Sequence, residues 1–247
     1  MTIQDILTYI DSRAPFATAE EWDNTGLLVG DPAAKVERVL VALDAPEGAL
    51  DTAIAVGADL ILTHHPVIFA PLKRLDAHGL PYRLAAAGIG LVAAHTNLDK
   101  AADGVNDTLA ARLGLENVTV ATDGMTRVGT LPAEVTVTAL AGQVAAALDT
   151  AVRVSNHDHP IRTVAVCGGS GGDFIPALIG VADAFVTGEV KHHQWLQASA
   201  DRLALIEAGH YATEAPVVDT LCRWLQEAFP ALTVTAYYDG DPYVTIK

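Results

Sequence analysis

The chain has 247 residues, of which 51% are hydrophobic, and its 30 acidic and 15 basic residues give a net charge of −15. This length and apolar content suffice for one large globular domain or two small ones. The negative charge, with basic residues scattered along the chain, opposes binding to nucleic acid phosphates or an anionic membrane. Two cysteines, Cys167 and Cys222, are too few for a disulfide framework or a cysteine zinc site, so we predict buried thiols.

The first residues, MTIQDILTYIDSRAP, have the pattern of an acidic amphipathic helix and lack the basic start of a signal peptide. No segment approaches the roughly 18 uninterrupted apolar residues of a membrane helix. We therefore expect a cytoplasmic protein with no membrane partner.

Further along, strand-like apolar runs alternate with helix-like stretches. The runs are VERVLVALD (36–44), ADLILTH (58–64), IGLVAAH (89–95), RTVAVCG (162–168), ADAFVTG (182–188) and RLALIEAGH (202–210). This alternation predicts an α/β fold with a largely parallel sheet.

The second half of the chain repeats the first. VLVA (39–42) corresponds to VAVC (164–167), ADLILT (58–63) to ADAFVT (182–187), and AHTNLD (94–99) to GHYATE (209–214). Three matches in the same order predict an internal duplication with two similar halves, 1–124 and 125–247. Packing about a pseudo-twofold axis would bring equivalent strand ends together, which is where α/β sheets bind ligands.

Two pairs of candidate metal ligands directly follow apolar strands. His95 and Asp99 are four residues apart, as are His210 and Glu214. If the chain is helical there, residues i and i+4 share a face, so imidazole and carboxylate can converge on one ion. One such pair is common on solvated helices, whereas two pairs at equivalent positions of a repeat indicate a metal site.

His64 and His65, in LTHHPVIF, lie at the end of another predicted strand. Pro66 cannot donate to a sheet and helps to end the strand, so side chains that diverge at this edge could each serve a different ion. Four imidazoles and two carboxylates suit zinc, iron, manganese, cobalt or nickel. They are too many for one tetrahedral zinc site and fit two ions about 3.5–4 Å apart that share a bridging carboxylate.

Four motifs together resemble the NGG-one-interacting-factor-three-like family, catalogued as GTP cyclohydrolase 1 type 2 homologues. They are EEWDNTGLLVG (20–30), THHP (63–66), HTNLD (95–99) and GHYATE (209–214), and the resemblance spans essentially the whole chain. The length is similar to the short form of the family, without the inserted middle domain. The resemblance implies two interlocked α/β halves, a dinuclear metal site between them at the strand ends, and a ring-shaped homohexamer.

The resemblance also implies a ligand set for two divalent ions, with Glu214 as the bridge and His95 either a direct ligand or a residue that orients one. The set is His64, His65, His95, Asp99, His210 and Glu214. A water acidified by the ions could attack an electrophilic carbon or phosphorus, so we predict a hydrolase that acts on a nucleotide or phosphoester. The alternative is a non-enzymatic metal-binding, storage or regulatory scaffold, which needs the same ligands but no substrate pocket.

Three further motifs are less specific. The loop CGGSGGDF (167–174) either cradles a phosphate or forms a tight glycine turn. Glu189 occupies the place that His65 has in the first half, and is either a general acid or base or an exposed carboxylate. Trp22-Asp23-Asn24 predicts a buried aromatic residue with a polar turn and no catalytic role.

The remaining histidines are not predicted ligands of the dinuclear site. EVKHHQW places His192 and His193 on a helix surface. His157 and His159 flank Asp158 in a turn before a proline, where they could add adventitious metal affinity.

Overall fold

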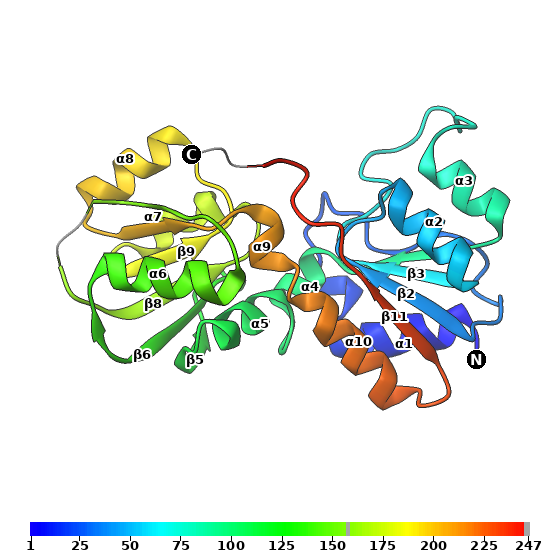
Figure 1. Cartoon of the computed structure of the whole chain (residues 1–247), viewed down its shortest axis with the longest axis horizontal. Coiled ribbons are helices and arrows are strands. Elements are labelled where there is room, and N and C mark those ends of the chain that lie inside the picture. Colours follow the sequence, from blue (N-terminus) through cyan, green and yellow to red (C-terminus); the bar gives the residue numbers. More distant parts are fainter. Residues whose placement is uncertain (157–158, 245–247) are drawn as a thin grey trace. The chain divides into compact units, whose positions relative to one another are not determined.

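The structure, a computed structural model, describes residues 1–156 and 159–244, so the predicted turn at His157 and Asp158 lies outside the described residues. The chain forms two compact units (Figure 1). Unit 1 comprises Met1–Gly104 and Val217–Asp239, and unit 2 comprises Val105–Pro216 and the segment that begins at Gly240. This division differs from the expected halves 1–124 and 125–247, because the chain returns after residue 216 to give unit 1 one more helix and strand.

Unit 1 contains a five-stranded sheet in the order β1-β4-β3-β2-β11. Four strands run parallel and β1 is antiparallel to β4. The strands are β1 (Gly26–Val29), β2 (Arg38–Ala42), β3 (Leu60–Thr63), β4 (Gly90–Ala93) and β11 (Thr233–Tyr237). The predicted runs at 36–44, 58–64 and 89–95 thus contain β2, β3 and β4.

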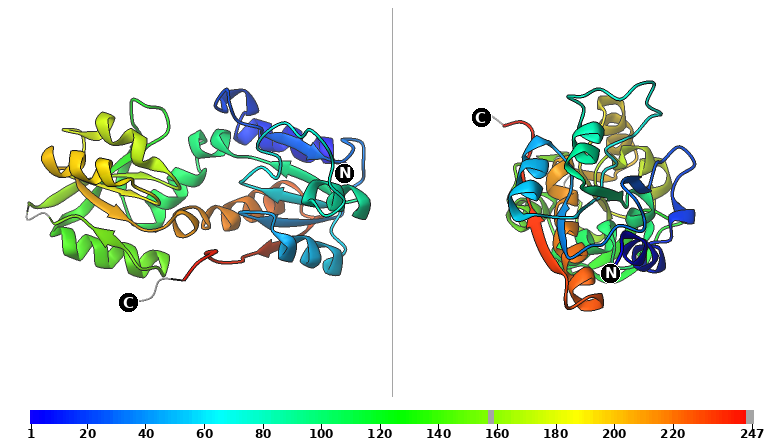
Figure 2. Two further views of the ribbon diagram at one scale, coloured as in Figure 1. Left: turned by 90° about the horizontal axis from the view of Figure 1, so that it is seen from above. Right: turned by 90° about the vertical axis from the view of Figure 1, so that its right-hand side faces the viewer.

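Helices cover both faces of this sheet (Figures 1 and 2). On one face, α2 (Glu47–Val56) and α3 (Leu80–Ala87) bury apolar side chains against β2, β3 and β4. On the other lie α10 (Val217–Ala228) and the predicted N-terminal helix, α1 (Ile3–Arg13), where the guanidinium of Arg13 stands 4.5 Å from the ring centre of Trp224. A short 3₁₀ turn, η1 (Phe16–Thr18), and α4 (Thr96–Lys100) complete the unit.

Unit 2 contains a six-stranded mixed sheet in the order β5-β6-β8-β9-β10-β7. Three neighbouring strands of this sheet run parallel to one another: β8 (Ile161–Cys167), β9 (Ala184–Thr187) and β10 (Ala204–Glu207). They match the predicted runs at 162–168, 182–188 and 202–210. The antiparallel strands were not predicted; they are β5 (Glu116–Val120), β6 (Arg127–Val135) and β7 (Arg153–Val154). β5 and β7 are exposed along their length and so have no buried apolar run.

The helices of unit 2 also lie on both faces of its sheet. One face packs against α5 (Val105–Arg112) and α6 (Val137–Leu148). The opposite face packs against α7 (Ile175–Leu178) and α8 (His192–Ala200). The 3₁₀ turn η2 (Gly171–Phe174) precedes α7, and α9 (His210–Glu214) follows β10. His192 and His193 are exposed on α8, as predicted.

The matched strands of the two units pair in the same register. Val39 pairs with Leu60 in unit 1, and their counterparts Val164 and Ala184 pair in unit 2. The third strand continues both ladders, because Thr63 pairs with the last residue of β4 and Thr187 with the last residue of β10. Both units therefore contain the same strand–helix–strand–helix–strand arrangement, while the duplication itself stays a prediction from the sequence.

An aspartate at the start of the second matched strand has the same hydrogen bonds in both units. Asp59 accepts the backbone N–H groups of Glu37 and Arg38 at 2.8 and 2.9 Å. Asp183 accepts those of Arg162 and Thr163 at 2.9 and 2.8 Å. Each carboxylate therefore joins the beginnings of two neighbouring strands and helps to set their register.

Both cysteines are shielded from solvent, Cys167 fully and Cys222 in part. Burial, and then the nearby charge of Asp219, raises the pKa of the Cys222 thiol to about 12. This thiol is therefore protonated at neutral pH, which makes it a poor nucleophile.

No helix within residues 1–156 and 159–244 has both the length and the apolar content needed to cross a membrane.

From the matched hydrogen bonds of Asp59 and Asp183, we expect the loss of either carboxylate to lower the free energy of unfolding by a similar amount. Replacing Asp59 or Asp183 with alanine leaves two strand-end N–H groups without their charged acceptor, which costs about 1–3 kcal/mol. Urea unfolding measures this loss. Asp51→Ala is the control, because that exposed carboxylate faces Arg83 at 3.5 Å across the surface and should contribute less than about 1 kcal/mol. Equal losses in all three variants would contradict the assigned role.

Candidate metal centre

Strand β3 ends at Thr63, and the next two residues are His64 and His65. Both of their backbone N–H groups donate to the Leu43 carbonyl, at 3.2 and 3.0 Å, so the chain leaves the sheet beside the end of β2. Their rings consequently converge, with centres 4.8 Å apart, instead of pointing to opposite faces. Neither residue belongs to the strand, so the alternation of side chains along a strand does not apply to them. That each histidine serves a different ion stays a prediction. The environments still differ, since His64 is fully buried and His65 is partly exposed.

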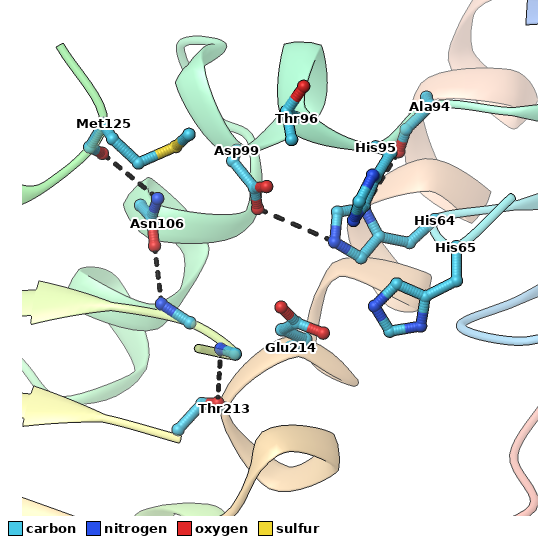
Figure 3. Close-up of polar contacts among 12 residues, drawn as sticks. His64, His65, Ala94, His95, Thr96, Asp99, Asn106, Met125, Thr213 and Glu214 are labelled. Atoms are coloured by element: carbon cyan, nitrogen blue, oxygen red, sulfur yellow. Dashed lines mark hydrogen bonds and ion pairs between the residues drawn. The ribbon is translucent and has the colours of Figure 1, made fainter. Parts of the chain in front are cut away.

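His95 follows β4 and precedes the first residue of α4. Its ring centre lies 5.1 Å from that of His64 and 5.5 Å from that of His65. One ring nitrogen from each of the three histidines lies within 4.8 Å of the other two, which is close enough for all three to bind one metal ion (Figure 3). Two strand ends that are separated in sequence, those of β3 and β4, thus bring three imidazoles together in unit 1.

The Nδ1 atom of each of these histidines faces an oxygen that can only accept a hydrogen bond. Nδ1 must therefore carry the proton, which leaves the Nε2 lone pair for a metal ion. The Nδ1 to oxygen distance is 2.8 Å in every case, from His64 to the Ala94 carbonyl, from His65 to Asp44 Oδ1, and from His95 to Asp23 Oδ1.

Asp23 is the most constrained of these acceptors. Its side chain is fully buried and also accepts hydrogen bonds from the backbone and hydroxyl of Thr96. Burial opposes ionisation, but the hydrogen bonds from His95 and Thr96 outweigh it and lower the pKa of the Asp23 carboxyl well below its usual value. Asp23 is thus a carboxylate at neutral pH and strengthens His95 as a metal ligand.

Sequence reasoning missed both Asp23 and Asp44. The motif Trp22-Asp23-Asn24 was predicted to bury its aromatic residue, which is wrong: the Trp22 side chain is 57% exposed, and Asp23 is the residue that turns inward. The signal for Asp44 was its position two residues after the end of β2, because carboxylates at strand ends can reach groups at the next strand end.

Asp99 lies on α4, and its Oδ1 atom is 3.6 Å from His64 Nε2 (Figure 3). Within unit 1, the structure therefore places Asp99 beside His64, whereas His95 is bound to Asp23. The helical turn expected after β4 is confirmed.

In unit 2, His210 and Glu214 are the first and last residues of α9, and His210 Nε2 lies 3.0 Å from Glu214 Oε2. The predicted i, i+4 pair is therefore formed. Gly209 precedes it with a φ of +85°, in the left-handed region that favours glycine. The N–H groups of Ala94 and Ala208 donate to the backbone carbonyls of Thr63 and Thr187, the last residues of β3 and β9. Unit 2 therefore has one more residue, Gly209, between this position and its histidine than unit 1 has.

The loop CGGSGGDF packs against this pair. A Cβ atom at Gly169 would overlap Glu214 Oε1, so a side chain there would displace the carboxylate. The N–H groups of Gly168, Gly169 and Gly171 donate to the side chains of Asn106, Thr213 and Thr187, at 2.8, 3.0 and 3.0 Å. Figure 3 shows the bonds to Asn106 and Thr213. Because these amides are used within unit 2, the loop fits a tight glycine turn better than a phosphate cradle.

Glu189 follows β9 and has a 57% exposed side chain, whose Oε1 atom is 3.4 Å from His210 Nδ1. It lines two cavities of unit 2. One, of about 250 Å³, also contains Lys191 and Gln194, and the other, of about 670 Å³, contains Arg153 and Tyr243. Glu189 is thus accessible to solvent while it contacts a candidate ligand.

Fold and strand-end residues together define an α/β protein of two sheets whose histidines and carboxylates can hold a divalent metal ion. The family model described as Duf34/NIF3 (NGG1p interacting factor 3) matches residues 1–241, and the chain belongs to this family. The resemblance found in the sequence is therefore confirmed.

Known proteins match nearly the whole chain. A "GTP cyclohydrolase 1 type 2 homolog" from Nostoc sp. is 40% identical to this chain, and the match covers 92% of each protein. A protein of the same name from Clostridium acetobutylicum is 30% identical over 98% of each protein. A crystal structure of a Staphylococcus aureus protein has a TM-score of 0.92 and 29% identity, covering 100% of this chain and 99% of that one. The fold class is therefore shared with solved structures.

The Asp23–His95 hydrogen bond predicts a loss of metal affinity in Asp23→Asn. The change removes the negative charge that supports His95, and such supporting partners typically contribute about 10–100-fold in metal affinity. Competition between the purified chain and a chromophoric zinc chelator measures the change. Glu21→Gln is the matched control, because Glu21 is exposed in the same segment. Equal affinity in Asp23→Asn and wild type would show that Asp23 does not support a ligand.

Proposed function

We propose that this chain is a dinuclear, divalent-metal-dependent hydrolase that acts on a nucleotide or related phosphoester. The observation that carries the proposal is the histidine cluster of unit 1, in which the Nδ1 atom of each ring is hydrogen-bonded to an oxygen and the three rings bring nitrogens close enough together to bind one metal ion. The proposed ligands, with Glu214 as the bridge, are His64, His65, His95, Asp99, His210 and Glu214.

The donor atoms fit the proposed ions. Neutral imidazoles and carboxylates suit zinc, iron, manganese, cobalt or nickel, and six ligands suit two ions rather than one. When bound, the ions would supply an acidified water and positive charge for a substrate anion. That charge would allow a chain with a net charge of −15 to accept a phosphorylated substrate.

The chain's own residues would position the ligands and move protons. Asp23 and Asp44 keep His95 and His65 in one tautomer, so these rings need not reorient when an ion binds. Glu189 is the proposed general acid or base, since it is exposed to water, lines two cavities and contacts His210.

The name of these relatives, "GTP cyclohydrolase 1 type 2 homolog", supports a purine nucleotide as the first substrate to test. The cavities beside Glu189 favour an enzyme over a metal-storage or regulatory scaffold, which needs no substrate pocket. We also propose that the chain acts in the cytoplasm as a ring-shaped homohexamer, as the family resemblance implies.

Removal of proposed ligands should abolish both metal binding and hydrolysis. In His65→Ala and Glu214→Ala, we expect the metal content to fall and the turnover of GTP or another phosphoester to drop at least about 100-fold, because the ions supply the nucleophile. Elemental analysis and a phosphate or ring-opening assay measure the two effects. His193→Ala is the control, because His193 is exposed on α8.

Unchanged activity and metal content in both ligand variants would contradict the proposal. A wild-type chain that binds metal tightly but hydrolyses none of a panel of nucleotides and phosphoesters would favour the scaffold instead.

Glu189→Gln separates proton transfer from metal binding. We expect turnover to fall about 10²–10⁴-fold, the usual contribution of a general acid or base, while the metal content stays unchanged. Steady-state kinetics and elemental analysis of the same preparation measure both, with the exposed Glu116→Gln in the same unit as control. If metal is lost in step with activity, Glu189 orients His210 and does not transfer protons.

A further inference from the structure

Two large aromatic side chains stand exposed beside the histidine cluster of unit 1. Trp22 is 57% exposed and Phe69 is 58% exposed. Their ring centres are 5.7 Å apart, with a tilt of 40° between the ring planes. Each also approaches the edge or face of His95, with ring centres at 6.0 Å for Trp22 and 6.3 Å for Phe69. The proposed hydrolase chemistry uses neither side chain.

The backbone on both sides of this aromatic pair is held in place. Asp23, next to Trp22, is bound to His95 and Thr96. The side-chain amide of Asn24 donates to the carbonyl of Ile68, the residue before Phe69, at 2.6 Å. The motif Trp22-Asp23-Asn24 thus links the histidine cluster to the segment that carries Phe69. Side chains held on such a support lose little conformational freedom when they bind a ligand.

The exposure of this pair needs a physical reason. Single exposed apolar residues are ordinary on a protein surface. Two adjacent aromatic rings next to candidate metal ligands are different, because grouped apolar surface that stays in contact with water can mark a binding site. Flat aromatic faces bind flat rings, because stacking depends on the π-face that every planar heterocycle presents. The surface area of two side chains is also much smaller than the roughly 800 Å² that each partner buries in a stable protein interface.

We propose that Trp22 and Phe69 form an aromatic platform that stacks against a planar heteroaromatic ring of the substrate at the edge of the histidine cluster. The inference rests on the proposed function and names the part of the substrate that the chain recognises. It selects a nucleobase-like ring over an aliphatic phosphoester. The fixed position of Trp22 relative to His95 would hold such a ring near the proposed ions.

Two ligands that differ in the ring test this proposal without requiring turnover. Isothermal titration of the metal-loaded full chain compares guanosine 5′-monophosphate with ribose 5-phosphate. We expect the nucleotide to bind more tightly, and Trp22→Ala and Phe69→Ala each to weaken it roughly fivefold or more, with ribose 5-phosphate unaffected. Trp22→Phe should keep most of the affinity but lose the quenching of tryptophan fluorescence by the nucleotide. Leu75→Ala, at an exposed aliphatic residue of the same unit, is the control.

Three results would overturn the proposal. The first is absent or equal binding of the two ligands by the wild-type chain, and the second is unchanged nucleotide affinity in both alanine variants. The third is a Trp22→Ala variant whose molar mass, measured by light scattering, differs from that of wild type while its nucleotide affinity is unchanged. This result would show that the aromatic pair contacts another copy of the chain.

Metal content separates this inference from the proposed function. We expect Trp22→Ala and Phe69→Ala to bind as much metal as wild type, because neither side chain supplies a ligand. Loss of metal in these variants would assign the aromatic pair to support of the histidines and overturn the platform. A wild-type chain without metal affinity that still prefers the nucleotide would refute the hydrolase and retain the platform.

Discussion

The hydrogen bonds at Nδ1 are the constraint on which the candidate centre of unit 1 depends. An imidazole that is free to rotate presents either nitrogen, whereas an acceptor at Nδ1 leaves Nε2 in one fixed direction. The strand order provides these acceptors. Because β3 lies between β4 and β2, His64 reaches the Ala94 carbonyl at the end of one neighbour and His65 reaches Asp44 at the end of the other.

Unit 2 has the same parallel core but different residues at its strand ends. Where unit 1 continues from Thr63 into two histidines, unit 2 continues from Thr187 through a glycine into Glu189. Gly209 adds a residue before His210, and the close approach of Gly169 to Glu214 leaves no space for a side chain. A shared scaffold can thus carry different chemistry, because the strand register is set by the buried residues and the ligands are set by the residues that follow.

Sequence patterns predicted the features that depend on local order. Apolar runs predicted β2, β3, β4, β8, β9 and β10, and the spacing of His210 and Glu214 predicted a shared helical face. Contacts between distant residues were missed, such as the bond from Asp23 to His95 across 72 positions and the return of α10 and β11 to unit 1. No local pattern encodes such pairings. The exposure of Trp22 was likewise missed, because aromatic residues are usually assigned to the core.

The central claim is that the Nε2 atoms of the anchored histidines bind divalent metal. Anomalous diffraction from crystals of the chain, purified with metal present and measured with and without GTP, tests it most directly. The account predicts two anomalous peaks, with His64 and His65 Nε2 atoms about 2.0–2.1 Å from an ion, as imidazole ligands of zinc usually are. Absence of any peak at this cluster in metal-replete protein, or coordination through Nδ1 with the Asp44 and Asp23 bonds broken, would contradict it.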